Sequence, residues 1–414
     1  MIGCHLPPYP ELMDGQPDIP IGERIRFHRQ ARKKTQAVVA GLAGVTEDYL
    51  SQIERGLKTP SATLLHRLAR ILAVPTSALF GESPAAAATP GHPASGAIHA
   101  ALASAGRDGA EAPDLADLRD RVDSAWQIWQ TSPRRYSEAG PLLPGLIADV
   151  QGAVRALRAD VNSAARREAA RIAADMYFLL RTFTKRIGRT DLSLLVADRG
   201  LRAAEDADDP LRIAAATWNV GQVLLATNEA DVAEEIVIRA AEALAPGLAR
   251  DLDATALSGA LWLVAVIASA RNGDAWTARD RLREHARPAA ERTGEGNVFW
   301  TVFGPTNAAL HGVSVEMEAG EAAEALRLAD EVDVTRCPSI ERRATFALEM
   351  ARCYDLRHED PGVLLHLLAA EREAPEDMRH NVLARDLVRG LLRRARPSLA
   401  PQVRELAQRI ELFG

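Results

Sequence analysis

Apolar residues recur at helical spacing along most of this 414-residue chain, and strict alternation of apolar and polar residues is almost absent. From residue 114 onward, long segments rich in Ala, Leu, Arg and Glu place apolar residues three or four positions apart. This spacing lines up apolar side chains on one face of an α-helix, whereas a strand requires a period of two. We therefore predict an all-α protein.

Short breaks divide the C-terminal region, residues 114–414, at nearly regular intervals. Their positions, 40, 45, 47 and 39 residues apart, are Gly188, Asn228, Gly273, Gly320 and the vicinity of Glu359. Glycine and asparagine readily adopt the left-handed backbone that ends a helix. Helical pairs repeated at such a period are typical of an α-solenoid. The C-terminal region is therefore predicted to be a solenoid of helical pairs.

Two short helices joined by a tight turn are predicted within residues 35–61. Thr35 is a good N-cap, because its hydroxyl accepts a hydrogen bond from a free amide of the following helix. Gly44 ends that helix in the left-handed conformation, and Thr46 caps the next one. Gln36 lies at the N-terminal end of the first helix, where free amides and the helix dipole favour a DNA phosphate. This spacing suits a helix that enters a DNA major groove.

The second of these helices has an apolar and a polar face, because Tyr49, Leu50 and Ile53 recur at spacings that turn them inward. The outward positions and the cap are candidates for contact with base edges. These residues are Thr46, Glu47, Asp48, Ser51 and Gln52.

The segment resembles the helix-turn-helix of phage repressor and Cro-type regulators, the Xre family, of the actinobacterial type. The likeness covers about residues 20–81, with TQ at 35, A at 40, G at 44, YLSQIERG from 49 and TPS from 59. The resemblance implies a bundle of about five short helices that binds a double-stranded DNA operator, an inverted repeat, as a homodimer. It also implies phosphate contacts from four residues, which are Thr35, Gln36, Arg55 and Lys58.

Glu47 and Asp48 are unusual on a surface that approaches a polyanion. A carboxylate accepts a hydrogen bond from the N4 amino group of cytosine, so one interpretation is a preference for cytosine. The alternative is that both residues stabilise the positive end of the helix dipole. The sequence leaves the two interpretations open.

Charge is distributed unevenly along the chain. Residues 21–82 hold ten Lys or Arg and five Asp or Glu, a net charge of +5. Because the whole chain has a net charge of −6, the other residues together carry −11. A basic module on an acidic body suits phosphate contact without indiscriminate DNA binding. Three further segments complete the predicted organisation: a disordered arm at 1–19, an Ala/Pro/Gly linker at 82–113 and the helical domain at 114–414.

The C-terminal region offers candidate ligand contacts. Residues 217–246 resemble a degenerate tetratricopeptide repeat, and a groove formed by such repeats suits a peptide or small molecule. The candidates are Trp218, Asn219 and Gln222 in this repeat, and Trp300 and Asn307 in the aromatic run 297–307. The alternative for the repeat is that Trp218 belongs to the core and Asn219 is a capped surface residue. The alternative for the aromatic run is a core between helices. Trp126 and Trp129 share a helix face and are expected to seal the end of the solenoid.

No enzyme motif, such as GxxxxGK, GxGxxG, HExxH or GxSxG, occurs in the sequence, and the three cysteines lack metal-site spacing. We expect no catalytic residue, no metal and no cofactor. No apolar run reaches the roughly 18 residues of a membrane span, and residues 257–270 are predicted to be a buried helix. A cytoplasmic location is expected.

The combination of a DNA reader and a helical-repeat domain resembles the peptide-sensing helix-turn-helix regulators of Gram-positive bacteria. The sequence therefore predicts a dimeric transcriptional regulator that senses a peptide or small molecule. The alternative is a DNA-bound scaffold that recruits another protein and has no small ligand.

Overall fold

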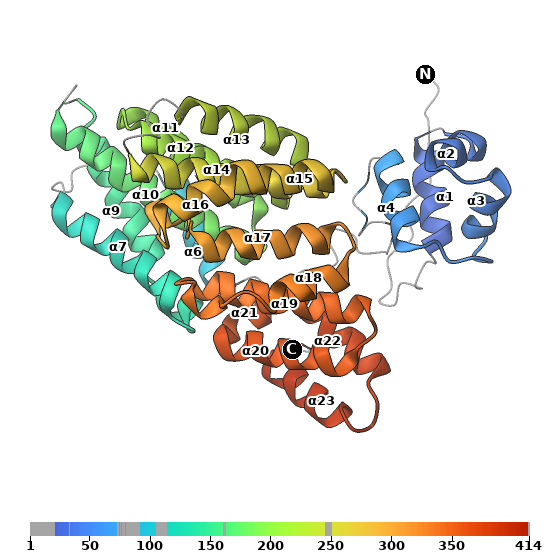
Figure 1. Ribbon diagram of the computed structural model, residues 1–414. Helices are drawn as coiled ribbons and strands as arrows, with labels where there is room; N and C mark the ends of the chain where they lie inside the picture. Colours follow the sequence, from blue (N-terminus) through green and yellow to red (C-terminus); the bar gives the residue numbers. More distant parts are fainter. Residues whose placement is uncertain are drawn as a thin grey trace, which may run out of the picture. The chain divides into compact units, whose positions relative to one another are not determined.

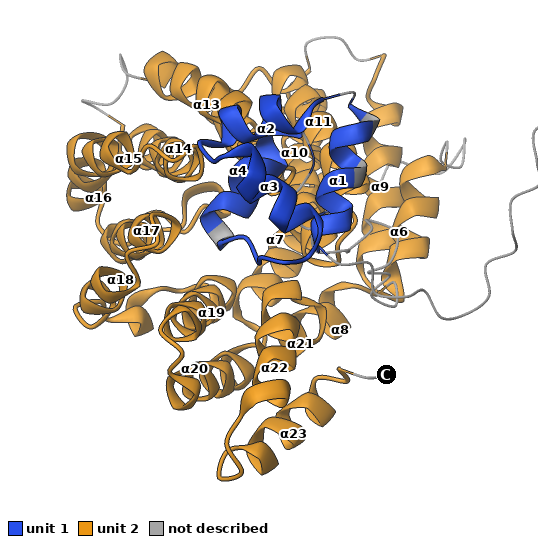
Figure 2. Cartoon of the chain, turned by 90° about the vertical axis from the view of Figure 1, so that its right-hand side faces the viewer, with its two compact units in different colours: residues 1–90 blue, residues 91–414 orange. Residues whose placement is uncertain are grey.

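A computed structural model describes residues 21–32, 34–72, 74, 76, 79, 92–104, 114–159, 163–244 and 251–412. The regular elements within these ranges are helices, and the predicted all-α fold is confirmed (Figure 1). The chain divides into unit 1, residues 1–90, and unit 2, residues 91–414 (Figure 2). The predicted N-terminal arm, residues 1–19, lies outside the described residues.

Unit 1 is a small bundle in which threonine and serine cap three of the helices. The helices are α1 (Ile21–Ala31), α2 (Gln36–Ala43), α3 (Glu47–Glu54) and α4 (Ala62–Ile71). The hydroxyls of Thr35, Thr46 and Ser61 accept from the amides three residues ahead at 3.2–3.3 Å. Gly44 follows α2 with φ of 68°, as the sequence predicts. Thr76 and Leu79 are also helical, at the place expected for a fifth helix.

The core of unit 1 combines the apolar stripes that the sequence predicts. Ile25, Leu50, Ile53 and Leu68 are each at most 1% exposed and belong to one cluster. Gly22 lets α1 approach α3 closely, because a Cβ at this position would lie 2.0 Å from the Ile53 carbonyl oxygen. The core thus holds α3 in place, with its polar face outward.

Unit 2 is built from helices that pack in chain order. Its α-helices are α6 (Ala94–Ala103), α7 (Leu115–Thr131), α8 (Arg135–Ala139), α9 (Leu143–Ala156), α10 (Ala164–Arg186), α11 (Thr190–Asp206), α12 (Pro210–Ala226), α13 (Ala230–Leu244), α14 (Leu252–Arg271), α15 (Ala275–Arg281), α16 (Arg287–Thr293), α17 (Pro305–Glu318), α18 (Ala322–Ala329), α19 (Ile340–Leu356), α20 (Asp360–Glu373), α21 (Pro375–His380), α22 (Val382–Arg394) and α23 (Ala400–Arg409). A π-helical turn, η2 (Leu282–Ala286), and two 3₁₀ turns, η3 (Val298–Trp300) and η4 (Val334–Arg336), complete it.

Five helical pairs in unit 2 confirm the predicted periodicity. Each of the five breaks contains a residue with positive φ between 58° and 85°, at Gly188, Asn228, Gly273, Gly320 and His358. These breaks separate α10 from α11, α12 from α13, α14 from α15, α17 from α18 and α19 from α20. Successive pairs also pack on one another, for example α11 on α12 and α13 on α14.

The pair α12–α13 shows why small residues recur in the repeat. A Cβ at Gly221 would lie 2.8 Å from a methyl carbon of Val237, so only glycine allows this approach of the two helices. Ala233 and Val237 are fully buried at the same contact. The small residues that suggested a tetratricopeptide-like repeat therefore set the distance between its helices.

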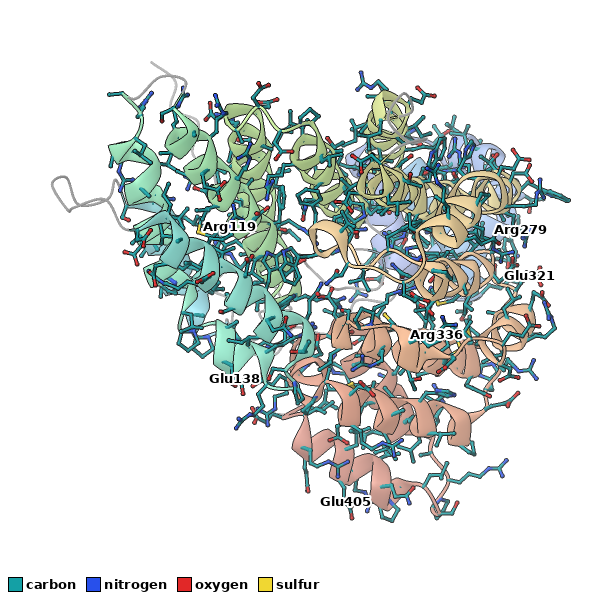
Figure 3. The ribbon with its side chains drawn as sticks, turned by 60° about the vertical axis from the view of Figure 1, so that its left-hand side comes forward. Arg119, Glu138, Arg279, Glu321, Arg336 and Glu405 are labelled. Carbon is teal, nitrogen blue, oxygen red and sulfur yellow. The ribbon has the colours of Figure 1, made fainter. Side chains whose placement is uncertain are left out.

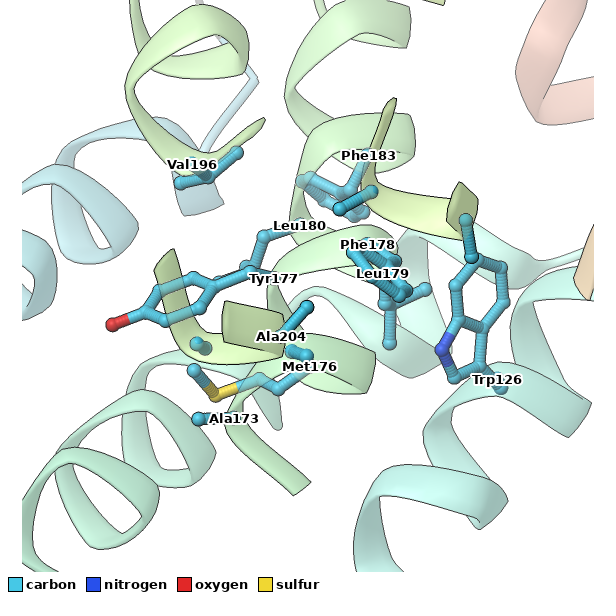
Figure 4. Packing of buried hydrophobic residues seen from close by; sticks show 14 of the residues in the cluster. Trp126, Ala173, Met176, Tyr177, Phe178, Leu179, Leu180, Phe183, Val196 and Ala204 are labelled. Atoms are coloured by element: carbon cyan, nitrogen blue, oxygen red, sulfur yellow. The ribbon is translucent and has the colours of Figure 1, made fainter. Parts of the chain in front are cut away.

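Helix α14, which contains the predicted buried helix 257–270, is the central apolar helix of unit 2. Its length and composition would allow a membrane span, but 78% of its most apolar window is buried inside the protein. The main core of unit 2 joins α14 to α10, where Met176, Phe178 and Phe183 pack against neighbouring helices (Figure 4). Charged side chains such as Glu321, Arg336 and Glu405 lie on the outside (Figure 3).

The prediction that residues 82–113 are a linker is wrong for the middle part of this segment. Residues 94–103 form α6, which packs on α9, and Ile98 and Leu102 are buried in the main core of unit 2. The physical reason is spacing: two large apolar residues four positions apart form a stripe even in an Ala-rich segment. Residues 82–91 and 105–113 lie outside the described residues.

Candidate functional site

Helix α3 presents the predicted base-contacting residues on its polar side. Thr46, Glu47 and Asp48 are exposed, and Ser51 and Gln52 are half-buried. The Thr46 hydroxyl caps the helix, so its oxygen already accepts the Tyr49 amide at 3.2 Å. Helix α3 therefore offers hydroxyl, carboxylate and amide groups along one accessible side, which are the groups that read base edges.

Asp48 and Gln52 form a pair on this side of α3. Gln52 Nε2 donates to Asp48 Oδ2 at 2.7 Å across one helical turn. Glu47 and Asp48 both lie in the first turn of α3, where negative charge is favoured by the helix dipole. Asp48 therefore orients Gln52 and leaves the Gln52 carbonyl oxygen available as an acceptor.

A buried ion pair that sequence reasoning missed joins α1, α2 and α3. Arg29 donates through Nε and Nη2 to the two carboxylate oxygens of Glu54 at 2.7 and 2.8 Å. Gln36 Nε2 donates to Glu54 Oε2 at 2.8 Å. Arg29 and Glu54 are 8% and 3% exposed. This network fixes the first turn of α2 against the last turn of α3.

The predicted phosphate-contacting residues lie around the ends of α2 and α3. Thr35, Arg55 and Lys58 are exposed and Gln36 is half-buried. The Lys58 ammonium lies 4.9 Å from the centre of the Tyr49 ring. A surface groove of about 480 Å³ brings together some of the predicted contacts: Thr35, Gln36, Glu47, Ser51 and Arg55 line it, and Thr46, Asp48, Gln52 and Lys58 do not.

Unit 2 contains a cavity of about 450 Å³ that four of the five predicted ligand contacts line. These are Trp218 and Gln222 from α12, Trp300 from η3 and Asn307 from α17. Asn219 does not line it, because its side chain is 1% exposed and bonds to Arg181 and to the Ala215 carbonyl. The prediction that Asn219 contacts a ligand is therefore wrong, because Asn219 lies on the interior side of α12.

One wall of the cavity is aromatic. Trp126 and Trp300 stack with ring centres 5.1 Å apart and planes inclined by 6°. Trp126 and Trp129, which the sequence predicts at the end of the solenoid, both line this cavity. Gln130 Nε2 donates to the Trp300 carbonyl at 3.2 Å and thereby ties α7 to the aromatic run.

The aromatic run 297–307 serves both purposes that the sequence left open. Trp300 lines the cavity, whereas Phe303 is buried against Gly259, whose missing Cβ would lie 2.0 Å from the ring. Phe299, Trp300 and Val302 have φ of 46°, 61° and 55°. Such backbone is costly for residues with large side chains, and strain of this kind gathers at functional sites.

Five cationic side chains line the cavity, and carboxylates pair with three of them. A paired cation has its charge compensated within the protein, so it needs no further partner. The three pairs are Arg186 with Glu341 at 2.6 Å, Arg271 with Glu318 at 3.6 Å and Arg342 with Glu349 at 3.5 Å.

Arg181 and Lys185 are the two remaining cations, one turn apart on α10. Arg181 Nε donates to Asn219 Oδ1 at 2.7 Å, and its guanidinium carbon lies 5.1 Å from the centre of the Trp218 ring. Lys185 Nζ has one hydrogen-bond partner among the described residues, Gln222 Oε1, at 3.5 Å. Among the described residues, no carboxylate oxygen lies within 4.0 Å of either cation.

Burial lowers the pKa of Lys185 from 10.5 to about 7, and the neighbouring Arg181, Arg186 and Arg271 act with burial, while Glu341 opposes them. The unfolded chain therefore binds more protons than the folded chain between pH 7 and pH 10.5, and stability rises with pH in this window. Below pH 7 Lys185 stays charged in the folded protein, and the burial of this charge lowers the free energy of unfolding by its full amount.

We expect Lys185→Met to raise the melting temperature of unit 2 at pH 6 by about 2–4 °C. The advantage of the variant should shrink as pH rises from 7 to 10.5, because the lysine of the wild type then becomes neutral on folding. Thermal unfolding followed by tryptophan fluorescence measures this, because all six tryptophans lie in unit 2. A difference in melting temperature between the variant and the wild type that does not change with pH would contradict the lowered pKa of Lys185.

The cations on α10 are the site residues that sequence reasoning missed. One signal was present: Lys185 is the only one of the four lysines outside residues 21–82, and it follows the mostly buried run 172–184 of α10. Within the described residues, no group of three or more His, Cys, Asp or Glu could hold a metal ion. Cys337 and Cys353 are buried free thiols, and Cys4 lies outside the described residues.

Comparisons with known proteins agree with the geometry of unit 1. A family model described as a helix-turn-helix domain matches residues 20–79. The immunity repressor of Bacillus phage phi105 is 39% identical over 62 residues, which are 15% of this chain and 43% of the repressor. An uncharacterised HTH-type transcriptional regulator of Mycobacterium tuberculosis is 40% identical over 59 residues, 14% of this chain and 42% of its own length.

The regulator SinR of Bacillus subtilis is 38% identical over 63 residues, 15% of this chain and 57% of SinR. The chain thus spans about half the length of the curated relatives it matches. Among solved structures, apo ComR of Streptococcus vestibularis is 11% identical with a TM-score of 0.35, over 90% of this chain and 97% of ComR. Bacillus thuringiensis PlcR, solved with the peptide PapR7 and DNA, is 12% identical with a TM-score of 0.28, over 66% and 94%.

The capped helices α2 and α3, the left-handed turn at Gly44 and the sequence matches all concern the same segment. Residues 20–79 of this chain are therefore a helix-turn-helix domain, similar to the domains of phage repressors and HTH-type transcriptional regulators.

Proposed function

We propose that the protein is a sequence-specific transcriptional regulator that binds an inverted-repeat operator as a homodimer and responds to an effector held in unit 2. The observation that carries the proposal is the polar side of α3, which leaves hydrogen-bonding groups accessible next to the capped N-terminus of α2. The net charge of +5 in residues 21–82 supports contact with a polyanion. Base contacts and phosphate contacts would then come from different residues.

Helix α3 would lie in the major groove, with Ser51 and Gln52 toward base edges. Gln36 would hold a phosphate at the N-terminus of α2, with its own position fixed by Glu54. Arg55 and Lys58, at the far end of α3, would meet the backbone of the opposite strand. One such domain contacts few base pairs, so a dimer on two half-sites supplies the affinity that a regulator needs.

The phosphate contacts have a specific signature. We expect Arg55→Ala combined with Lys58→Ala to weaken binding to operator and to scrambled DNA by the same factor. The slope of the logarithm of affinity against the logarithm of salt should fall by about 2 for each domain bound, because each contact releases about one counterion. Fluorescence anisotropy over a salt series measures both quantities. An unchanged slope would show that these residues do not contact DNA.

Unit 2 would bind an effector that shifts the placement of the two DNA-binding domains in the dimer. The cavity beside the strained wall Phe299–Val302 favours this role over that of a scaffold without a small ligand. Thermal unfolding with fractionated cell extract separates the two. A stabilising low-molecular-weight fraction supports the regulator, and stabilisation by protein fractions alone supports the scaffold.

A further inference from the structure

The cavity of unit 2 has more positive than negative groups. Five basic and three carboxylate side chains line it, so the excess is two positive charges when Lys185 is protonated. Each carboxylate already lies within 4.0 Å of a cation other than Arg181 and Lys185. The excess charge therefore belongs to these two residues.

Arg181 is held by uncharged groups and has unused donors. It is 4% exposed, and its only hydrogen bond to a described residue uses Nε. Trp218 supports one face of the guanidinium, and Asn219 occupies one edge. The two Nη groups are accessible from the cavity, because they are not fully buried and make no hydrogen bond to a described residue. A buried cation in this state is costly unless an anion joins it.

Glu341 attracts both cations from a distance, but it forms no ion pair with either of them. Its carboxylate accepts from Arg186 at 2.6 and 2.9 Å, and Arg135, which is completely buried, lies 3.4 Å from the other oxygen. Glu341 thus already serves two closer guanidinium groups. Lys185 makes a long contact to Gln222. The pair on α10 consequently forms a cationic site with no anion of its own among the described residues.

The wall next to this cationic site is apolar. Leu225 from α12 and Leu263, Val264 and Ile267 from α14 line the same cavity, together with the Trp218 ring. The volume of about 450 Å³ lies within the range of about 300–1,000 Å³ that is usual for small-molecule pockets. A molecule that fits the cavity therefore needs a negative group at one end and an apolar body.

We infer that this cavity binds an amphipathic carboxylate, whose anionic group is held by Arg181 and Lys185 and whose apolar body lies against α12 and α14. A guanidinium fork matches a carboxylate in two parallel hydrogen bonds, and the lysine adds a point charge. A free apolar acid and the C-terminal end of a peptide share this chemistry. The binding of a carboxylate in this cavity does not depend on DNA. The inference rests on the proposed function only where it treats the bound carboxylate as the effector of a regulator.

Two matched ligand series test the inference on the full chain. The first compares octanoate with octan-1-ol and octylamine, and the second compares the peptide acid Ac-Leu-Val-Leu with its C-terminal amide. Tryptophan fluorescence and titration calorimetry give the affinities, since four of the six tryptophans line the cavity. We expect the anion in at least one series to bind at least tenfold more tightly than its uncharged partner. The series that shows this preference identifies the source of the carboxylate.

The variant Arg181→Gln with Lys185→Met should lose the preference for the anion. Arg239→Gln, an exposed position on α13, is the matched control and should keep it. Lys185→Met alone controls for folding, because it should raise the melting temperature while weakening the preference. Equal affinity for charged and uncharged partners, absence of binding in both series, or an unchanged preference in the double variant would each overturn the inference.

Failure of this inference and failure of the proposed function give different results. If octanoate or the peptide acid binds but the full chain has no operator, the anion site stands and the regulator proposal fails. If an operator is found and neither acid binds, the DNA-binding role stands and the anion site is wrong.

Discussion

Glu54→Ala is expected to destabilise unit 1 by about 3–5 kcal/mol, because the substitution leaves the Arg29 guanidinium buried without its carboxylate. Among the described residues, Arg29 would keep one hydrogen-bond partner, the Lys34 carbonyl at 2.9 Å. Gln36 would lose its partner in the same step. A domain of this size has a total stability of only about 5 kcal/mol, so about 0–2 kcal/mol would remain and up to about half of the unit 1 population would be unfolded.

Hydrogen exchange on the full chain locates this effect. Peptides covering α2 to α4 should lose protection, whereas tryptophan fluorescence should remain that of the wild type, since all tryptophans lie in unit 2. Glu47→Ala, on the exposed side of the same helix, is the control and should change protection little. Wild-type protection in Glu54→Ala would mean that the ion pair contributes no stability.

A second variant separates the charge from the fold. Arg29→Met combined with Glu54→Leu replaces the buried pair with apolar side chains, and we expect it to recover much of the lost stability. Gln36 would remain without Glu54 in this variant. If this stable variant still binds DNA more weakly than the wild type, the defect would result from the loss of the contact between Glu54 and Gln36.

Gln36→Ala combined with Gln52→Ala is expected to weaken operator binding by about 100-fold at physiological salt. Each contact is worth roughly 1–3 kcal/mol, and the two residues act at different places, so their effects should nearly add. The ion pair of Arg29 with Glu54 remains in both variants, so the fold should persist. Anisotropy with operator and scrambled DNA measures the effect.

The single variants should behave differently. Gln52→Ala should lower affinity for the operator only, whereas Gln36→Ala should lower affinity for both DNAs, because a phosphate contact carries no sequence information. Gln127→Ala, an exposed glutamine on α7 of unit 2, is the matched control. Equal affinity of Gln52→Ala and the wild type for the operator would remove Gln52 from the recognition surface.

The sequence predicts the helices and their breaks because local chemistry determines both. Thr35, Thr46 and Ser61 act as caps through their own hydroxyls, and Gly188 and Gly273 adopt positive φ without steric cost. These signals lie within a few residues of the feature that they specify. The all-α class and the positions of the helical pairs follow from them.

The buried ion pair of unit 1 was missed although a signal was present. Arg29 is four residues after Ile25, and Glu54 is four residues after Leu50, so each charged residue lies on an apolar stripe. A charged residue in such a position is buried only with a partner. Neither position alone identifies that partner, since the two residues are 25 positions apart.

The cavity of unit 2 was predicted in part for a related reason. Trp218 and Trp300 stand out because aromatic residues are rare in the chain, and both line the cavity. Arg181 does not stand out among 50 basic residues, and Lys185 stands out only as the one lysine outside residues 21–82. Their importance depends on the absence of a nearby carboxylate among the described residues, and only the packing of α10, α12 and α14 reveals it.

Genome-wide capture of DNA fragments by the full chain at physiological salt tests whether the protein recognises a specific DNA sequence. We expect one inverted-repeat motif, shared by the captured fragments and lost with Gln36→Ala and Gln52→Ala. Fragments without a shared motif, or a motif that the double variant still captures, would contradict a regulator that reads DNA through α3.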